Sequence, residues 1–76
     1  MFYVYLIKNK ETNNTYIGYT EDLGRRVKEH KDKKPELVYY EAYKSEKDAR
    51  IRERRLKQRG QSIRRLKEKL KYSLED

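Results

Sequence analysis

The chain has 76 residues, of which 34% are hydrophobic, so we expect one small domain over residues 1–76 with a modest core. It has no cysteine and one histidine, which excludes a disulfide framework and a cysteine- or histidine-rich zinc site. Twenty-one Lys and Arg against 13 Asp and Glu give a net charge of +8, which predicts a polyanionic partner.

Three segments have the composition of β-strands. Residues 2–7 and 15–19 are rich in aromatic and β-branched side chains, and the polar stretch between them contains Asn13-Asn14, which tolerates positive φ. The pair predicts a β-hairpin. A third strand is predicted over residues 37–43.

Three helices are expected, at about residues 21–32, 46–59 and 62–72. The resulting order β-β-α-β-α-α predicts an α+β fold, a three-stranded antiparallel sheet flanked by helices. No segment is apolar enough to span a membrane, and the start of the chain favours a strand over a signal peptide. We therefore expect a cytoplasmic monomer that does not bind membranes.

The helix ends carry recognisable signals. Thr20 is expected to cap the first helix, with two acidic residues in its first turn. Ser45 resembles the start of a capping box for the second helix, and Gly60 is a natural C′ residue at its end. Ser62 is expected to cap the last helix, whose apolar side is formed by Ile63, Leu66, Leu70 and Leu74.

The hairpin brings two tyrosines together. If Lys8 and Thr15 flank the turn, Tyr5 pairs with Gly18, and Tyr16 lies diagonally from Tyr5 on one face of the sheet. A glycine inside a strand often marks close approach of a ligand or of backbone. The alternative is that tyrosines are simply good strand residues.

Two helices carry further candidate residues. Arg26 and His30 are spaced i, i+4 on the first helix, where a guanidinium suits a phosphate and an imidazole can relay a proton; a solvated surface is the alternative. On the second helix, Glu53 shares with Ala49 and Leu56 the stripe that should face the sheet. An acid there is either a ligand for Mg²⁺ or Mn²⁺ or the partner of a neighbouring Arg.

The basic charge is concentrated between Arg50 and Lys71, which contain eleven basic and two acidic residues. This run predicts contact with nucleic acid, although charged helices are also common as solvated surfaces. The residues that we expect to bind nucleic acid are Gly18, Arg54, Arg55, Arg59, Arg64, Arg65 and Lys67.

The candidate residues occur in an order that resembles a known family. Tyr3-Val4-Tyr5, Tyr16-Ile17-Gly18, Asp22-Leu23-x-x-Arg26-x-x-x-His30 and the later Glu53 resemble the motifs of the GIY-YIG nuclease superfamily. The chain looks most like its small stand-alone members, which resemble the N-terminal endonuclease domain of the excision-repair subunit UvrC. Many members of the family have an Asn beyond the catalytic Glu, whereas in this chain no Asn follows Asn14. The segment over residues 31–36 is also shorter than in many stand-alone relatives.

The resemblance implies a metal-dependent endonuclease that hydrolyses phosphodiester bonds with one Mg²⁺ or Mn²⁺ ion, on DNA in preference to RNA, in DNA repair. It implies that Tyr5 and Tyr16 lie at the active centre, where one deprotonates or orients the attacking water. By the same resemblance, Arg26 binds the scissile phosphate, His30 assists proton transfer and Glu53 holds the metal.

Two other functions stay open at this point. A nucleic-acid-binding module could keep the fold and lack the chemistry, because phosphate attraction needs only charge. A protein-interaction adaptor could use the same basic helices to bind an acidic partner. Nucleic-acid binding that fails even at low salt would favour the adaptor.

Overall fold

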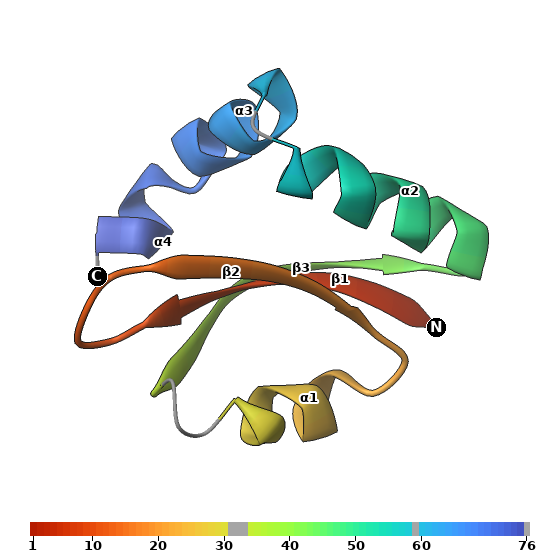
Figure 1. The fold of residues 1–76 in the computed structure, drawn as a ribbon, viewed down its shortest axis with the longest axis horizontal. Coiled ribbons are helices and arrows are strands. Elements are labelled where there is room, and N and C mark those ends of the chain that lie inside the picture. Colours follow the sequence, from red (N-terminus) through yellow and green to blue (C-terminus); the bar gives the residue numbers. More distant parts are fainter. Residues whose placement is uncertain (31–33, 59, 76) are drawn as a thin grey trace.

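The computed structural model describes residues 1–30, 34–58 and 60–75, and within them a three-stranded sheet separates two layers of helix (Figure 1). The strands are β1 (Phe2–Asn9), β2 (Thr15–Thr20) and β3 (Pro35–Tyr43), and the helices are α1 (Leu23–Glu29), α2 (Glu46–Lys57), α3 (Gln61–Lys69) and α4 (Lys71–Glu75). Helix α1 lies on one face of the sheet, and α2, α3 and α4 lie on the other (Figure 1). The predicted α+β fold and the order of its elements are confirmed.

The sheet is antiparallel and has the spatial order β2-β1-β3. The hairpin register is the one expected from the sequence, with Lys8 opposite Thr15 and Tyr5 opposite Gly18. The turn uses Asn13 at φ 63°, a conformation that asparagine tolerates better than most residues. Strand β2 is therefore an edge strand, and its outer side is available to other groups.

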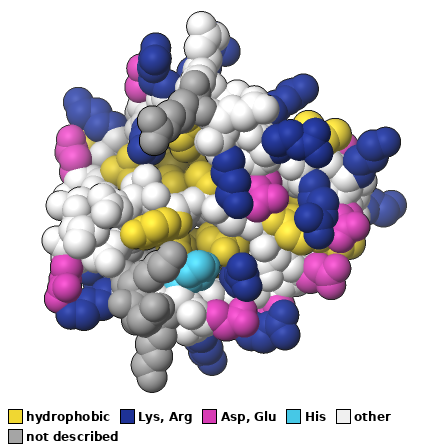
Figure 2. Space-filling view, viewed as in Figure 1, with side chains coloured by type: hydrophobic (Ala, Val, Ile, Leu, Met, Phe, Trp, Pro, Cys, Tyr) yellow, Lys and Arg dark blue, Asp and Glu magenta, His cyan; other side chains and the backbone are white. Residues whose placement is uncertain are grey.

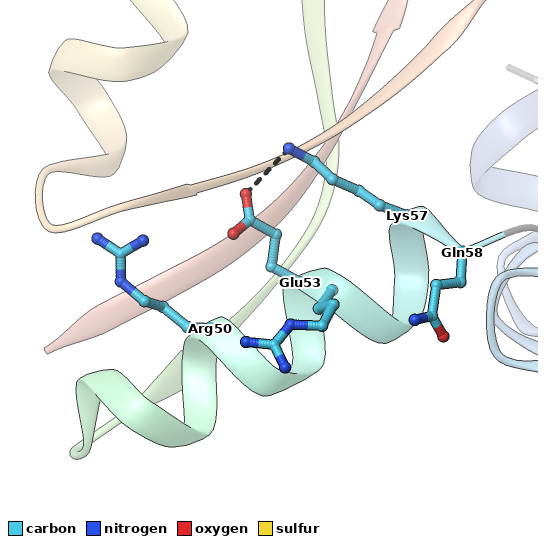
Figure 3. A pocket seen from close by; sticks show the side chains of 5 residues that line it. Arg50, Glu53, Lys57 and Gln58 are labelled. Atoms are coloured by element: carbon cyan, nitrogen blue, oxygen red, sulfur yellow. Dashed lines mark ion pairs between the residues drawn. The ribbon is translucent and has the colours of Figure 1, made fainter.

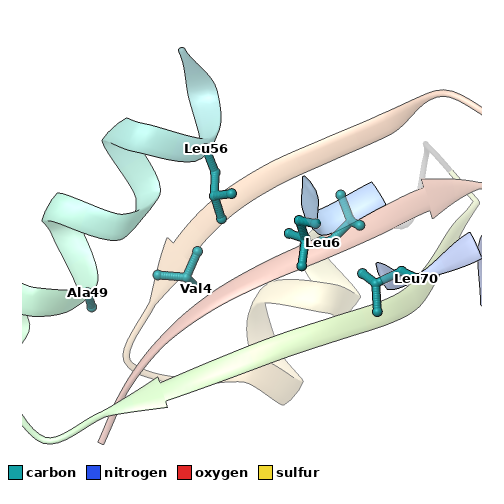
Figure 4. Packing of buried hydrophobic residues seen from close by; sticks show 6 residues of the cluster. Val4, Leu6, Ala49, Leu56 and Leu70 are labelled. Atoms are coloured by element: carbon teal, nitrogen blue, oxygen red, sulfur yellow. The ribbon is translucent and has the colours of Figure 1, made fainter. Parts of the chain in front are cut away.

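The core lies between the sheet and the layer formed by α2, α3 and α4. Side chains alternate along β1, so Val4 and Leu6 point to this layer and Tyr5 points to α1. The buried cluster consists of Val4, Leu6, Ala49, Leu56, Leu66 and Leu70, several of which are seen packing in Figure 4. Phe2, Ile17, Tyr19, Val38, Tyr39, Tyr43, Ile63 and Leu74 pack against it.

Helix α1 begins and ends inside the predicted range. Its N-cap is Asp22, whose Oδ1 accepts from the Arg25 N–H at 3.1 Å, so the predicted cap at Thr20 is wrong. Thr20 instead forms a tight turn with Asp22, whose N–H donates to the threonine Oγ1 at 3.0 Å. Because the acids precede the helix, its first turn holds none of them. The helix ends at Glu29, and the predicted residues 31–32 lie outside the described part of the chain.

The junction between α2 and α3 also differs from the prediction. Ser45 is the N-cap of α2 but its side chain makes no capping hydrogen bond, so the predicted capping box does not form. Gly60 has φ −158° and is the N-cap of α3, not a left-handed C′ residue, and Ser62 lies within α3. The C-cap of α2 is Gln58, and the predicted end at Arg59 lies outside the described residues.

The last predicted helix is divided into two. Helix α3 ends at Lys69; its C-cap is the buried Leu70, where the backbone turns to φ −99° and ψ 20°, and α4 follows. Within α4, the carbonyl of Leu74 accepts a hydrogen bond at 2.9 Å from the Nζ of Lys8, which is almost buried in β1. The bend lets Leu70 and Leu74 both contact the core, and the lysine binds a helix-end carbonyl that the helix itself leaves unsatisfied.

A polar cluster joins β3 to α2 on the core side of the sheet. Glu41, whose side chain is 15% exposed, accepts hydrogen bonds from both Arg52 Nε, at 3.0 Å, and Arg52 Nη2, at 3.0 Å. It also accepts from the hydroxyls of Tyr39, at 2.7 Å, and Tyr43. Burial opposes ionisation of Glu41, but these donors outweigh it and hold its pKa below 4.5.

The cluster makes stability depend on pH at both extremes. Burial and the hydrogen bond to Glu41 raise the pKa of Tyr39 and of Tyr43 to about 12, above the ordinary 10.0. Their contribution is therefore complete below pH 10.0 and is lost as the pH rises toward 12, because the unfolded chain ionises first. The contribution of Glu41 is complete above its ordinary pKa of 4.5 and is lost as the pH falls below it.

Replacing Glu41 by glutamine is expected to lower the free energy of unfolding by about 2 kcal/mol at neutral pH, because Arg52 loses a charged acceptor. The variant should also lose part of the decline in stability below pH 4.5. Urea unfolding across a pH series measures both effects, and Glu75→Gln on exposed α4 is the control. Equal acid sensitivity of Glu41→Gln and wild type would contradict the account.

Candidate active site

The tyrosine of the first motif is the centre of a polar cluster between the sheet and α1. Tyr5 is 3% exposed, yet its hydroxyl lies 3.1 Å from His30 Nε2 and accepts a hydrogen bond from Arg26 Nε at 3.3 Å. The rings of Tyr5 and His30 meet edge to face, with centroids 6.0 Å apart. Three of the predicted site residues are thus brought into direct contact.

Helix α1 determines where Arg26 and His30 lie. The cap at Asp22 sets the start of the helix, and the spacing i, i+4 places both side chains on the side that faces Tyr5. His30 is the C-cap, and its N–H donates to the Val27 carbonyl at 3.2 Å. The hydrogen bond to Tyr5 raises the pKa of Arg26. Arg26 therefore stays cationic while it contacts the phenol.

Gly18 has a specific role beside Tyr5. A Cβ built on Gly18 would lie 2.2 Å from the Tyr5 hydroxyl oxygen and 2.3 Å from its Cζ, far inside contact distance. The tyrosine ring lies across β2 in the space that this glycine leaves, and Gly18 itself is buried. The sequence predicted that Gly18 contacts nucleic acid; that contact stays a prediction, and the structure shows a packing reason for the residue.

Tyr16 lies on the same face of the sheet as Tyr5, because it pairs with Ile7. It is half-buried at the outer side of the edge strand. There it lines a hollow of about 480 Å³ with Lys57 and Lys67. The predicted diagonal arrangement of the two tyrosines is confirmed by the register.

Glu53 approaches from the other side of the sheet. Its helix, α2, packs through Ala49 and Leu56 on the face opposite Tyr5, so Glu53 and Tyr5 come from opposite faces of the sheet. Glu53 lies on the same side of α2 as this apolar stripe, but it is only partly buried. In Figure 3, Glu53 and Lys57 both point from α2 toward the strands.

The Glu53 carboxylate is 19% exposed and pairs with Lys57 Nζ at 3.1 Å. The sequence left open a salt bridge to a neighbouring Arg; the observed partner is the lysine one turn ahead. The pair lines a hollow of about 420 Å³ together with Arg50, Arg54 and Gln58 (Figure 3). Glu53 thus combines partial burial with access to the surface.

A hard cation can be held by several protein side chains or by one or two carboxylates together with water, and the surroundings of Glu53 suit the second of these modes. Among the described residues no group of three or more His, Asp or Glu side chains could hold a metal ion. Mg²⁺ and Mn²⁺ often take only one or two carboxylates and complete their coordination with water and substrate phosphate. A single, partly buried carboxylate that borders an open hollow fits this second mode.

The basic residues predicted to bind nucleic acid are spread over several surfaces. Arg54 and Arg55 are exposed on α2, and Arg64, Arg65 and Lys67 are exposed on α3; Arg59 lies outside the described residues. Arg54 borders the hollow of Glu53, Lys67 borders that of Tyr16, and Arg65 borders a separate one beside β3. Figure 2 shows Lys and Arg side chains gathered over α2, with acidic ones among them.

Two residues near the candidate site were not singled out by sequence reasoning. Lys57 is the ion-pair partner of Glu53, and Arg50 lines the hollow of Glu53 as well as one that contains Arg26. The spacing i−3 and i+4 from Glu53 is the signal that could have found both. Within the basic run, however, these spacings do not stand out.

The fold and the site define a class: an α+β domain with a three-stranded antiparallel sheet and a tyrosine held between an arginine and a histidine. The sequence model of the GIY-YIG catalytic domain matches residues 1–69, so the chain belongs to the GIY-YIG family and has a nuclease-type fold. No curated protein and no solved structure matches the chain. No helix in the described residues is long and apolar enough to cross a membrane.

Proposed function

We propose that the protein is a metal-dependent endonuclease that hydrolyses phosphodiester bonds. The observation that carries the proposal is the Tyr5 hydroxyl, which lies between Arg26 and His30 over Gly18. In this arrangement His30 can accept the hydroxyl proton of Tyr5, and Arg26 can stabilise the phenolate that remains. Membership of the GIY-YIG family supports a nucleic-acid substrate.

The hydrogen bonds suggest a direction for the proton. Arg26 Nε can only donate, so the Tyr5 oxygen accepts there. The tyrosine can then donate to His30 Nε2, if His30 carries its ring proton on Nδ1. Tyr5 would pass its proton to His30 and take one from the attacking water, while Arg26 stabilises the phenolate. Tyr16, on the same face, would help to orient that water.

Arg26 and Glu53 would act on the phosphate and its leaving group. Arg26 donates through Nε to Tyr5, and its terminal nitrogens suit the oxygens of the scissile phosphate. Glu53 would hold one Mg²⁺ or Mn²⁺ ion, which supplies a Lewis acid for the charge that develops on the leaving 3′ oxygen. The ends left would be a 3′-hydroxyl and a 5′-phosphate.

The substrate class, the biological role and the location are proposed from the family resemblance alone. The likeness to the UvrC endonuclease domain favours DNA over RNA, a role in DNA repair and a cytoplasmic location. A monomer is the simplest assembly consistent with a site built within one chain.

A cleavage assay tests the function directly. End-labelled single-stranded, duplex and branched DNA, and matching RNA, are incubated with Mg²⁺ or Mn²⁺ and, in parallel, with a chelator. We expect metal-dependent cleavage of at least one substrate. Cleavage that persists in chelator would contradict the metal requirement.

A second candidate is a nucleic-acid-binding module of the same fold without activity. The ion pair between Glu53 and Lys57 favours it, because a carboxylate neutralised by a lysine holds a cation less strongly. The absence of an Asn beyond Asn14 points the same way. Salt-dependent binding by a wild-type chain that cuts no substrate of the panel would select this candidate.

Both candidates predict salt-dependent binding through the basic helices. Reversing the charges of Arg64 and Arg65 to glutamate is expected to weaken binding by about tenfold or more for all sequences. The salt slope should fall by about one for each phosphate that the variant no longer neutralises. Fluorescence anisotropy over a salt series measures this. The control, Lys10→Glu with Lys44→Glu, makes the same change in net charge outside α2 and α3. Equal weakening of binding in both double variants would contradict specific use of α3.

A further inference from the structure

Three hollows adjoin one another: the two outer ones are lined in part by β2, and the one between them is lined by α2 and its C-cap. The first, of about 270 Å³, lies at the end of the strand and contains Tyr19, Thr20, Arg25, Arg26, Glu46 and Arg50. The second, of about 420 Å³, contains Arg50 and Glu53. The third, of about 480 Å³, contains Tyr16 and Lys57. We call these three hollows together the β2-edge track.

Shared lining residues connect the hollows. Arg50 lines both the first and the second, and Lys57 and Gln58 line both the second and the third. The first hollow takes residues from α1 and from α2, which lie on opposite faces of the sheet. The track therefore passes around the edge strand and connects the side that carries Arg26 with the side that carries Glu53.

The charge of the track suits a polyanion. Its described lining includes the cations Arg25, Arg26, Arg50, Arg54, Lys57 and Lys67 against the acids Glu21, Glu46 and Glu53. Glu46 and Glu53 are each paired with a cation of the track. Cations that outnumber acids along a continuous edge fit a chain of phosphodiesters, which carries one negative charge per phosphate.

Arg50 is held in place at the junction of the first two hollows. Its guanidinium lies 4.4 Å from the centroid of the Tyr19 ring, and its Nε lies 3.8 Å from Glu46 Oε2. The Tyr19 hydroxyl donates to the same Glu46 oxygen at 2.7 Å. These contacts orient Arg50 before any ligand binds, and its terminal nitrogens form the fork that suits phosphate oxygens.

We propose that the β2-edge track binds the sugar–phosphate backbone of the substrate and that Arg50 binds the phosphate next to the scissile one. This rests on the proposed function and deepens it. Arg50 is then the residue that guides the strand from Arg26 to Glu53, so that both act on one phosphodiester. A backbone ligand predicts that Arg50 matters for every nucleotide sequence, because phosphates are the same in all of them.

The test compares Arg50→Ala with Lys47→Ala, a control that removes one positive charge from the same helix outside the track. Anisotropy of a short fluorescein-labelled DNA duplex and of its labelled single strand is measured in chelator over a salt series. We expect Arg50→Ala to lose about tenfold in affinity and to reduce the salt slope by about one, and Lys47→Ala to change much less. Arg50→Lys, which keeps the charge without the fork, should fall between them.

Equal behaviour of Arg50→Ala and Lys47→Ala on both probes would overturn the proposal. So would equal binding by Arg50→Ala and wild type. Arg50 is 57% exposed on its side chain, so its removal should leave the fold intact, which circular dichroism checks. Excess inorganic phosphate should compete weakly with the labelled DNA; competition equal to that of unlabelled DNA would mean a site for free phosphate and would overturn the track.

The outcome is separable from that of the proposed function. If wild type cuts DNA and Arg50→Ala cuts as well as Lys47→Ala, the track is wrong and the nuclease stands. If wild type never cuts, but Arg50→Ala shows the selective loss of binding, the nuclease fails and the track stands on the binding module. If wild type binds neither probe at low salt, both fail.

Discussion

Replacing Glu53 by glutamine is expected to reduce metal-dependent cleavage by about a thousandfold or more, because the metal supplies several kcal/mol of charge stabilisation in the transition state. Glutamine keeps nearly the same shape and loses the charge. Nucleic-acid binding in chelator should survive or improve slightly, since a negative charge near the phosphates is removed. Gel-based cleavage and anisotropy, both on the same DNA, measure the two effects.

The melting temperature of Glu53→Gln distinguishes a metal-ligand role from a structural role less sharply than its cleavage rate does. The Glu53–Lys57 pair is i, i+4 on a helix, and the Lys57 side chain is 55% exposed, so its loss should cost only about 0.3–0.5 kcal/mol. Both roles therefore predict a melting temperature close to that of wild type. A Glu53→Gln chain that still cuts at the wild-type rate would refute the metal-ligand role.

The matched control is Glu68→Gln, the same chemical change on exposed α3. It should leave cleavage and melting unchanged. If Glu68→Gln reduced cleavage as much as Glu53→Gln does, the effect would reflect net charge and not a ligand at one position. Mg²⁺ titration of the activity adds a second readout, because removal of a ligand raises the metal concentration needed.

Replacing Gly18 by alanine is expected to reduce cleavage by about a hundredfold, because a catalytic group displaced by about 1 Å can lose that much. The new Cβ would lie 2.2 Å from the Tyr5 hydroxyl oxygen, so the ring must move away from β2. That movement breaks the geometry that joins Tyr5 to Arg26 and His30. Cleavage rate at saturating substrate is the measurement.

The control for this variant is Gly24→Ala in α1. A Cβ there would come no closer than 3.9 Å to Asp22 Oδ1, which is ordinary contact. Because alanine favours helix, Gly24→Ala should gain about 0.5–1 kcal/mol of stability and keep its cleavage rate. Wild-type cleavage by Gly18→Ala would mean that the position of Tyr5 is not needed for the reaction.

The local patterns of the chain predicted its strands and helices, except for the division of the last helix, and part of the site. Period-two alternation and turn residues predicted the hairpin register, so Tyr5 opposite Gly18 and Tyr16 on the same face could be expected without coordinates. The i, i+4 spacing likewise predicted that Arg26 and His30 share a side of α1. The helix ends were predicted less accurately, because neighbouring residues can each act as a cap. Asp22 and not Thr20 caps α1, and Gly60 precedes α3 although it was expected to end the helix before it.

The sequence by itself determined which residues form strands and helices, which side chains share a face, and the family to which the motifs point, since these depend on spacing along one element. Only the tertiary structure decided that α2 packs on the face opposite Tyr5 and that Glu53 pairs with Lys57. It also decided that Arg50 joins the hollow of Arg26 to that of Glu53. The spacing of residues along the chain cannot predict these contacts. Which face of the sheet a helix covers depends on how the apolar sides of several separate elements pack together.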